Sequence, residues 1–200
     1  MATIVAVEAD GGAVLAGDRR HTAGGTVASD DKRHVFDFGA VGAAAVRASD
    51  GVGEPGGAGD AETTGSAGGI DEFRRRLETE VEFHETERGE AMGVTRLATV
   101  ASRIADDEGV EAVVAGRDDD KKNDRQPRIR GLRSDGSILG DNVAAFGSGA
   151  QLALGVLEGR EEGLSLDDVA ELAREAIDTA ADRDTDTDTE IDTYRLADDD

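Results

Sequence analysis

The sequence opens with MATIVAVEADGGAVLAGDRR, residues 1–20, and this stretch decides the fold. Two apolar runs, residues 3–7 and 13–16, flank the turn sequence Asp10-Gly11-Gly12. A turn of this kind between apolar runs is a strong signal for a two-stranded hairpin. The second run ends in Asp18-Arg19-Arg20, so we expect an acid and two bases to leave the end of a buried strand beside the start of the chain.

The start of the chain also combines three groups with catalytic potential. A free α-amine, the carboxylate of Asp18 and the hydroxyl of Thr3 are the components of N-terminal-nucleophile catalysis. In such a reaction the hydroxyl attacks a carbonyl carbon while a nearby base takes its proton. The sequence therefore indicates the first strand as part of a candidate active site.

Length and composition limit the classes of protein that fit. A chain of 200 residues suits one domain with a full hydrophobic core, without a metal or disulfide to staple it. The sequence has no cysteine, which excludes thiol catalysis and a disulfide framework. No apolar run approaches membrane-spanning length, and the first residues lack the pattern of a signal peptide. We therefore expect a cytoplasmic protein with no membrane partner.

The charge balance is strongly acidic, because 45 Asp and Glu residues against 22 Lys and Arg residues give a formal net charge of −23. The acids are spread through every segment, which favours the cytoplasmic protein of a halophile, whose surface charges are screened at molar salt. An acidic surface for basic partners is the alternative interpretation. No basic patch stands out against this background, so nucleic acid is not an expected partner.

Metal and cofactor sites find little support in the pattern. His21, His34 and His84 are dispersed, and a metal site needs clustered ligands. The Asp-rich residues 183–192 lack the central glycine and the terminal glutamate of a calcium loop. We expect neither a metal nor a cofactor.

The whole pattern predicts one α+β domain over residues 1–196. Residues 48–69, rich in Gly, Ala, Ser and Asp, predict a surface loop or insertion, and residues 197–200 an acidic tail. Ser165, with Asp168 three residues later, predicts a capping box for the last helix. The order of strands, two helices, strands, two helices and a strand favours a four-layer α-β-β-α sandwich of two antiparallel sheets flanked by helix pairs. Besides the first hairpin, strands are expected at residues 34–38, 41–46, 111–116, 128–133, 138–139, 143–146 and 190–196, a turn with a short extended piece at 21–28, and helices at 70–88, 94–107, 150–158 and 166–181.

The opening of the chain resembles that of proteasome β-type subunits, in which a threonine is followed by an Asp-Gly turn and then by Ala-x-Asp-Arg-Arg. Three later segments are similar to family segments in the same order. They are Lys32-Arg33-His34-Val35-Phe36, the run from Ser134-Asp135-Gly136-Ser137 through Gly147-Ser148-Gly149 to Gly155-Val156-Leu157-Glu158, and Arg183-Asp184-x-x-Thr187-x-x-x-Ile191-Asp192. The resemblance covers nearly the whole chain apart from the Gly-rich segment, and it implies the N-terminal-nucleophile hydrolase fold.

The resemblance also implies where a threonine-type peptidase site would lie. The nucleophile position falls on Ala2, the lysine position on His34, and the glycine that offers its N–H to the oxyanion corresponds to Arg47. Removal of Met1 before a small residue would leave an α-amine on Ala2 and no hydroxyl. A pair between Asp18 and His34 would let the histidine accept a proton near neutral pH.

The residues around the family's terminal amine match this sequence more closely than the nucleophile and lysine positions do. Asp18, Ser148, Asp184 and Thr187 match the carboxylate, serine, aspartate and second serine around the family's terminal amine, and Thr22 matches a position that faces an extended substrate. Structural roles fit the same residues. Ser148 suits the N-cap of a helix, and the repeat that contains Asp184 and Thr187 suits a solvated turn.

Two functions therefore follow from the sequence. The first is a proteasome-like subunit that has lost peptidase activity and serves assembly or regulation. The second is an active threonine-type endopeptidase that uses Thr3 after removal of Met1 and Ala2, and that acts on unfolded polypeptides. In either case we expect a homo- or hetero-oligomer with proteasome-type subunits, and the net charge makes such an assembly depend on salt.

Overall fold

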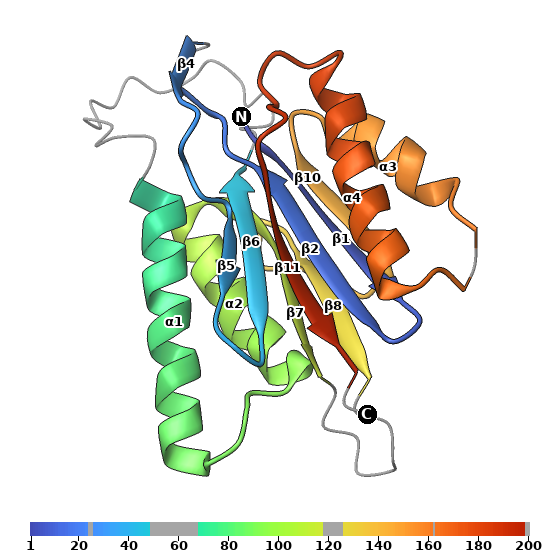
Figure 1. The fold of residues 1–200 in the computed structure, drawn as a ribbon. Coiled ribbons are helices and arrows are strands. Elements are labelled where there is room, and N and C mark those ends of the chain that lie inside the picture. The colour runs from blue at the N-terminus through green and yellow to red at the C-terminus, as the bar shows by residue number, and fades with distance from the viewer. Residues whose placement is uncertain (24–25, 49–67, 118–125, 162, 199–200) are drawn as a thin grey trace, which may run out of the picture.

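Two antiparallel sheets lie face to face, and each carries a pair of helices on its outer side (Figure 1). The computed structural model describes residues 1–198 apart from 24–25, 49–67, 118–125 and 162. The first sheet has the order β10-β1-β2-β11, and the second has the order β5-β6-β7-β8-β9. The strands are β1 Thr3–Ala9, β2 Gly12–Asp18, β3 His21–Ala23, β4 Thr26–Ser29, β5 Val35–Asp37, β6 Gly42–Arg47, β7 Val110–Arg117, β8 Pro127–Leu132, β9 Ile138–Leu139, β10 Val143–Gly147 and β11 Ile191–Ala197.

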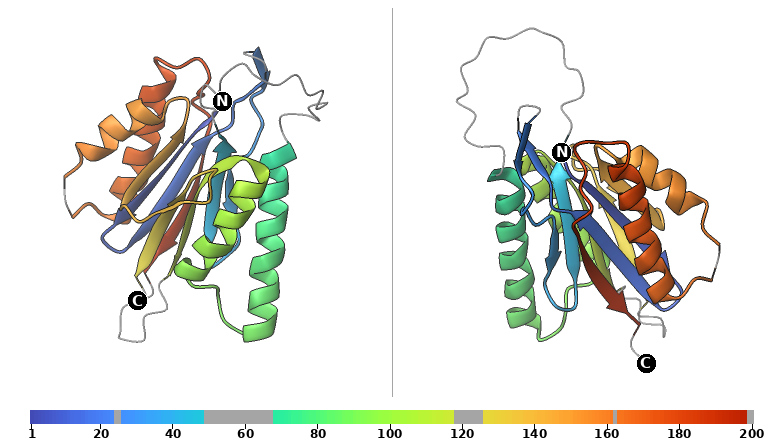
Figure 2. Two further views of the ribbon diagram at one scale, coloured as in Figure 1. Left: turned by 180° about the vertical axis from the view of Figure 1, so that it is seen from behind. Right: turned by 45° about the horizontal axis from the view of Figure 1, so that its top comes forward.

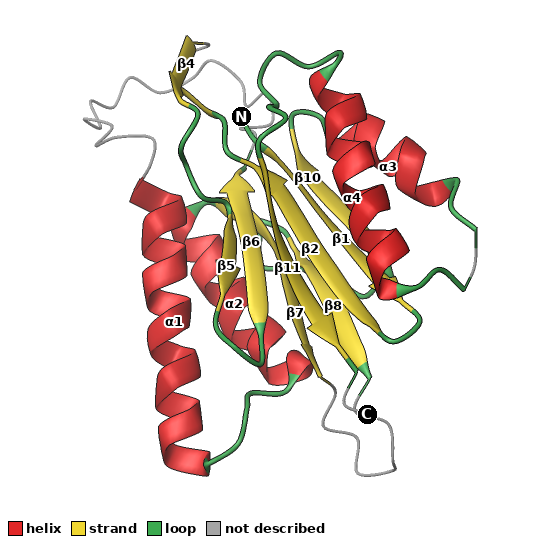
Figure 3. Cartoon of the chain, in the orientation of Figure 1, coloured by secondary structure: helices red, strands yellow, loops and turns green. Residues whose placement is uncertain are grey.

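Helices α1 Gly68–Arg88 and α2 Val94–Glu108 cover the five-stranded sheet, whereas α3 Ala150–Glu158 and α4 Leu166–Ala181 cover the four-stranded sheet. Figure 3 distinguishes the helices from the sheets by colour. Figure 2 shows the same arrangement from behind and with the top of the molecule turned toward the viewer. The predicted α+β class and the four-layer sandwich are therefore confirmed. None of the helices among the described residues is long and apolar enough to cross a membrane.

The first hairpin forms the centre of the four-stranded sheet. β1 pairs with β2 on one side and with β10 on the other, and Gly11 makes the turn with φ of 83°. Because side chains alternate along a strand, β1 supplies two hydrophobic layers. Ile4 and Ala6 pack between the sheets, whereas Val5 and Val7 pack against α3 and α4. The hairpin is thus buried on both faces, which explains its unbroken apolar runs.

The other predicted elements are present with small shifts at their ends. The capping box of α4 is confirmed, since Ser165 and Asp168 exchange side-chain to backbone hydrogen bonds. Residues 21–28, predicted as a turn and one extended piece, instead hold two paired strands, β3 and β4. Most of the predicted loop lies at residues 49–67, outside the described residues, and its last two residues already belong to α1. Of the predicted tail, Ala197 still belongs to β11, and residues 199–200 lie outside the described residues.

Candidate functional site

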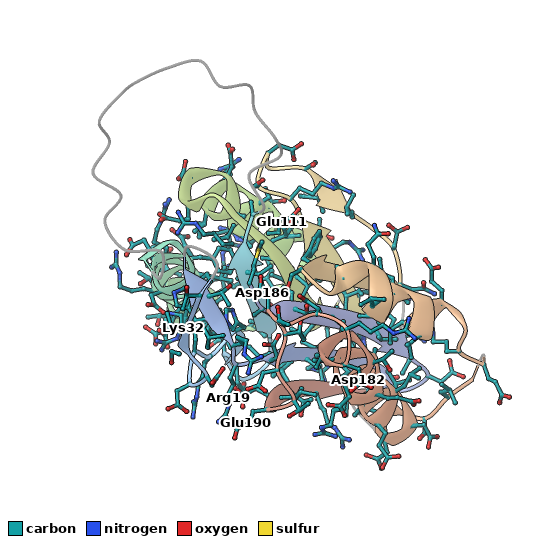
Figure 4. All side chains as sticks on the ribbon, turned by 90° about the horizontal axis from the view of Figure 1, so that it is seen from above. Arg19, Lys32, Glu111, Asp182, Asp186 and Glu190 are labelled. Atoms are coloured by element: carbon teal, nitrogen blue, oxygen red, sulfur yellow. The ribbon has the colours of Figure 1, made fainter. Side chains whose placement is uncertain are left out.

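The candidate site lies at the end of the sandwich where β1 begins (Figure 1). Thr3 pairs with Gly147 at the end of β10, and Asp18, the last residue of β2, pairs with Ile191 at the start of β11. Antiparallel pairing therefore brings the start of β1, the end of β2, the turn after β10 and the start of β11 to one edge. Figure 4 looks down on this edge and shows Asp186 near the middle of the view, with Arg19 and Glu190 close to each other below it.

Asp18 joins three segments of the chain at this edge. Its carboxylate is buried and accepts three backbone hydrogen bonds, from Thr3 N at 2.5 Å, Arg20 N at 3.0 Å and Asp188 N at 3.1 Å. Burial raises the pKa of Asp18 to about 6, because removing the carboxylate from water outweighs the three N–H donors. The predicted carboxylate is therefore next to the start of β1, where it holds the backbone of Thr3.

Thr3 belongs to a closed network of hydroxyl groups. Its Oγ1 accepts from Gly149 N at 2.9 Å and lies 2.8 Å from Thr187 Oγ1. The Thr187 hydroxyl donates to Asp184 Oδ2 at 2.7 Å, so the Thr3 hydroxyl must donate its own proton to Thr187. Ser148 Oγ lies 2.5 Å from the same Asp184 oxygen. We call Thr3, Ser148, Asp184, Thr187 and the Gly149 N–H the hydroxyl network.

Thr3 and Thr187 in the hydroxyl network are sheltered beside α4, whereas Asp184 is half-buried and Ser148 is exposed. Thr3 is fully buried and Thr187 is 1% exposed. A Cβ added at Gly149 would lie 2.7 Å from Ala180 Cβ and 2.8 Å from Thr3 Oγ1, so only glycine fits there. Burial raises the pKa of Asp184, but the hydrogen bonds from Ser148 and Thr187 outweigh it, and the net pKa is below the usual range. Residues 185–186 form the expected turn, but Thr187 is buried and not solvated. The N-cap role of Ser148 is wrong, because Gly149 is the N-cap of α3.

Ala2 faces the opposite side of the sheet from Thr3. Ala2 is 2% exposed and packs with Ile4 and Ala6 between the two sheets. His34 lies on this side as well, because a Cβ added at Gly17 would lie 2.9 Å from Ile4 Cγ2 and 3.6 Å from His34 Cβ. We call the intersheet side at this edge, with Ala2, Ile4 and His34, the inner face.

His34 is a buried, neutral imidazole. Its Nδ1 lies 2.9 Å from the carbonyl oxygen of Ala45, so Nδ1 carries the proton and Nε2 carries the lone pair. Within the described residues Nε2 has no hydrogen-bond partner. Burial lowers the pKa of His34 to about 4, which makes the ring neutral at pH 7. The pair considered between Asp18 and His34 does not form, because each makes its hydrogen bonds to backbone groups instead.

Met1 is held by residues from three segments. Its α-amine contacts Thr22 Oγ1 and lies 3.2 Å from Asp186 Oδ2, and its carbonyl oxygen contacts Ser148 Oγ. Thr22 is thus close to the start of the chain. Arg47 ends β6 opposite Val110, with its side chain exposed.

Three contributors were missed from the sequence: Gly149, Asp186 and Asp188. Gly149 stood in a quoted motif, but only the packing of α4 explains its N–H donor role. Asp186 and Asp188 lie in a repeat of Asp and Thr, in which no local signal separates one acid from the next. In the described parts of the chain, no three His, Cys, Asp or Glu residues come close enough to hold a metal ion.

Comparison with known proteins identifies the family. The family model for proteasome subunits matches residues 61–196. A proteasome subunit beta 2 of Haloterrigena turkmenica is 31% identical over 188 residues, covering 92% of this chain and 70% of the relative. This chain belongs to the proteasome beta-subunit family. Among other beta subunits, that of Methanopyrus kandleri is 31% identical over 191 residues (92% of this chain, 80% of the relative), and that of Haloferax volcanii 31% over 186 residues (91% and 68%).

The geometry therefore gives the edge of this proteasome beta-family chain two chemically different sides. The hydroxyl network offers oxygen atoms, but all of them are engaged with one another or with backbone groups. The inner face offers a methyl group at Ala2 and an unprotonated nitrogen at His34. Attack on a carbonyl carbon needs a hydroxyl and a base on the same side.

Proposed function

We propose that this chain is a proteasome beta-type subunit without threonine peptidase activity, which acts in the assembly or regulation of a proteasome-type particle. The observation that carries the proposal is the inner face. Ala2 presents a methyl group where the family resemblance puts the nucleophile, and His34 is neutral where the resemblance puts a lysine. A neutral imidazole does not supply the fixed positive charge that favours loss of a hydroxyl proton.

The geometry opposes an active peptidase that uses Thr3. The Thr3 hydroxyl is fully buried on the α4 side, and its proton is directed at Thr187. To reach the inner face, β1 would have to slip by one residue, which would turn each of its side chains to the other face. Val5 and Val7 would then leave the hydrophobic layer under α3 and α4.

Support for an assembly role comes from the fold and the relatives. The relatives are named as proteasome subunits, and the sandwich common to such subunits is complete here apart from the segments outside the described residues. A subunit can be retained for its contacts with neighbours after its catalytic groups are lost, because fold and chemistry are separable. The partners proposed are other proteasome-type subunits or further copies of this chain, in the cytoplasm of a halophile.

The test is the intact mass of protein purified in molar salt, measured before and after a threonine-directed covalent peptidase probe. We expect no adduct, while an active 20S proteasome treated in parallel is labelled. An adduct on the wild-type chain that disappears in Thr3→Ala would overturn the proposal. Sedimentation of the same preparation, alone and mixed with proteasome-type subunits, tests the assembly role, and a chain that remains monomeric in both at molar salt would contradict that part.

A further inference from the structure

The outer edge of β11 is a long strand edge that pairs with no other strand in the described residues. Of the four strands that end the two sheets of the sandwich, β11 has seven residues, β10 five, β5 three and β9 two. β11 contains no proline or glycine, and its register with β2 runs from residue 191 to residue 197 without a bulge. Proteins commonly shorten, bend or interrupt an open edge, because such an edge pairs with other chains. β11 is neither short nor interrupted, so it can accept a further strand.

The main-chain groups of alternate residues point outward along this edge. The hydrogen bonds from Arg19 N to Glu190 O and from Asp198 N to Gly11 O show that the even-numbered residues direct their main-chain groups at β2. In an antiparallel ladder these residues alternate with residues whose N–H and C=O groups face the other way. The outward residues are Ile191, Thr193 and Arg195, whereas the outward carbonyl of the last residue of β11 accepts from Arg117.

A cavity of about 470 Å³ lies beside this edge, between β11, β5 and the start of α1. The ring of Tyr194 and the side chains of Val35 and Phe36 give it an apolar part. Figure 1 shows β5 and β11 next to each other, with α1 on one side and α4 on the other. Because side chains alternate along a strand, every second side chain of an added strand would point toward this cavity.

The other side chains of an added strand would meet α4. Arg174 donates to Thr193 Oγ1 at 3.0 Å, so this side of α4 lies beside β11. Glu171 and Asp178 lie on the same side of the helix, three residues before Arg174 and four after it. Both are exposed, and neither forms an ion pair with another described residue. Pairing with β11 of a second copy would put two acidic α4 helices side by side, so the charge instead favours an extended segment with basic side chains on this face.

We propose that the outer edge of β11 binds an extended segment of another polypeptide as an added antiparallel strand. Its basic side chains lie toward α4, and its small apolar side chains lie toward the cavity beside β5. Hydrogen bonds to the outward main-chain groups provide the affinity, and the two rows of side chains provide the specificity. This inference goes beyond the proposed function, because strand addition at β11 does not depend on whether the chain cuts peptide bonds.

The test uses the full chain in molar salt and a seven-residue peptide of alternating lysine and valine, acetylated and amidated at its ends. Binding is followed by ¹⁵N NMR through the backbone amides of Ile191, Thr193 and Arg195. We expect saturable shifts centred on these amides. The same peptide with glutamate in place of lysine should bind about threefold more weakly, because its carboxylates face the acids of α4.

Two methylated forms of the lysine peptide test the strand geometry without a change in the protein. Residues directly opposite each other in an antiparallel pair have their side chains on the same face. The lysines therefore lie opposite the outward residues of β11 and direct their own N–H groups at them. N-methylation of the lysine amides should abolish binding, whereas N-methylation of the valine amides, which face away, should leave the affinity within about twofold.

Variants of the chain sharpen the test. Thr193→Pro removes one outward N–H, a change that an edge strand tolerates, and it should weaken binding about five- to tenfold. Thr193→Val keeps this N–H and loses only the hydroxyl, so its affinity should match the wild type.

A charge reversal tests the face toward α4. Glu171→Lys should weaken binding of the lysine peptide about threefold and strengthen binding of the glutamate peptide. Glu87→Lys makes the same charge change at an exposed position of α1, which covers the other sheet, and should leave both affinities unchanged. The amide spectrum of each variant shows that it is folded.

The inference is overturned by any of three results. They are no saturable shifts at the β11 amides, equal binding of the peptide methylated at its lysine amides, or self-association of the chain that Thr193→Pro abolishes, which would make a second copy the occupant. These results leave the loss of peptidase activity untouched, because that proposal fails on a covalent adduct and not on reversible binding.

Discussion

The hydroxyl network and the inner face lie on opposite faces of β1, and the two faces differ in how their polar groups are hydrogen-bonded. In the hydroxyl network the oxygen atoms of Thr3, Thr187 and Asp184 have partners at 2.7 to 2.9 Å. On the inner face, His34 Nε2 is buried and has no hydrogen-bond partner in the described residues. The side chain of Ala2 on the same face is a methyl group, which forms no hydrogen bond. The polar groups on one side of β1 thus have hydrogen-bond partners, whereas the buried nitrogen on the other side has none in the described residues.

The difference indicates what each side is for. A buried network in which each member is satisfied stabilises a single arrangement of the chain, and losing one member leaves another without a partner. The hydroxyl network holds β1, the turn before α3 and the loop before β11 together, which is a structural role independent of catalysis. On the inner face, Ala2 and Ile4 belong to the hydrophobic core between the sheets. Under the proposed function, Ala2 and His34 stand where a peptidase would need a nucleophile and a cation.

The largest effect on the free energy of unfolding is expected at Gly147, where the end of β10 contacts Ala2. Gly147 has φ of 104°, and a Cβ there would lie 1.9 Å from the carbonyl oxygen of Ala2. Gly147→Ala should therefore lower the free energy of unfolding by about 4 kcal/mol or more, or prevent folding. Urea unfolding in molar salt measures it, and Gly140→Ala, which meets no atom within 4 Å, is the matched control with little change expected.

Equal stability of the two alanine variants would contradict the tight contact between the turn and Ala2. It would also show that the start of β1 can move away from β10, which the closed network does not allow.

A smaller loss is expected from opening the network at Thr3. Thr3→Val removes the acceptor of the buried Gly149 N–H, so the free energy of unfolding should fall by about 2 to 3 kcal/mol. Thr3→Ser keeps the hydroxyl and loses only a methyl group, and it should lose about 1 kcal/mol. Urea unfolding of both variants checks the order. If valine is tolerated as well as serine, the network is not what holds β1.

The smallest effect depends on pH and separates the two sides of the edge. His34 has its pKa lowered to about 4, so the folded chain resists a proton that the unfolded chain accepts near pH 6.5, and stability falls as pH drops through this range. Asp18 has its pKa raised to about 6, so its contribution to stability falls as pH rises from 4 to 6. The two groups therefore oppose each other between about pH 4 and 6.

Replacing His34 should remove its contribution to the pH dependence of stability and leave that of Asp18. We subtract the free energy of unfolding of the wild type from that of His34→Leu at each pH. This difference should be about 2 kcal/mol lower at pH 7 than at pH 5, because only the wild type loses stability as pH falls through the range in which His34 resists protonation. Urea unfolding at both pH values, with salt held constant, measures this difference. A stability change in His34→Leu that is the same at pH 5 and pH 7 would mean that His34 is not buried in neutral form.

The sequence was sufficient for the fold and for which segments meet. The hairpin, the capping box of α4 and the order of elements depend on local patterns of apolar, glycine and capping residues, and these patterns are strong here. The grouping of Asp18, Ser148, Asp184 and Thr187 in one region was implied by the resemblance to proteasome β-type subunits and not by these local patterns. The roles of these residues at the edge remain proposals.

The side on which each group acts could not be predicted from the residues alone. Ser148 was compatible with an N-cap, but its hydroxyl contacts Asp184, 36 residues later, and the carbonyl oxygen of Met1. The pairing of Asp18 with His34 failed because burial left each next to backbone groups. Such contacts depend on how the layers pack, and no short motif records that.

The position of the first hairpin has a consequence for synthesis of the protein. β1 and β2 are made first, but their partners β10 and β11 lie at residues 143–147 and 191–197. At ribosomal speeds of about 5 to 20 residues per second, both edges of the hairpin stay unpaired for roughly 6 to 26 seconds until β10 is made, and the β2 edge for roughly 9 to 36 seconds until β11 is made. During that time its apolar faces are open to other nascent chains, so the protein depends on chaperones or on rapid completion more than a fold with local contacts would.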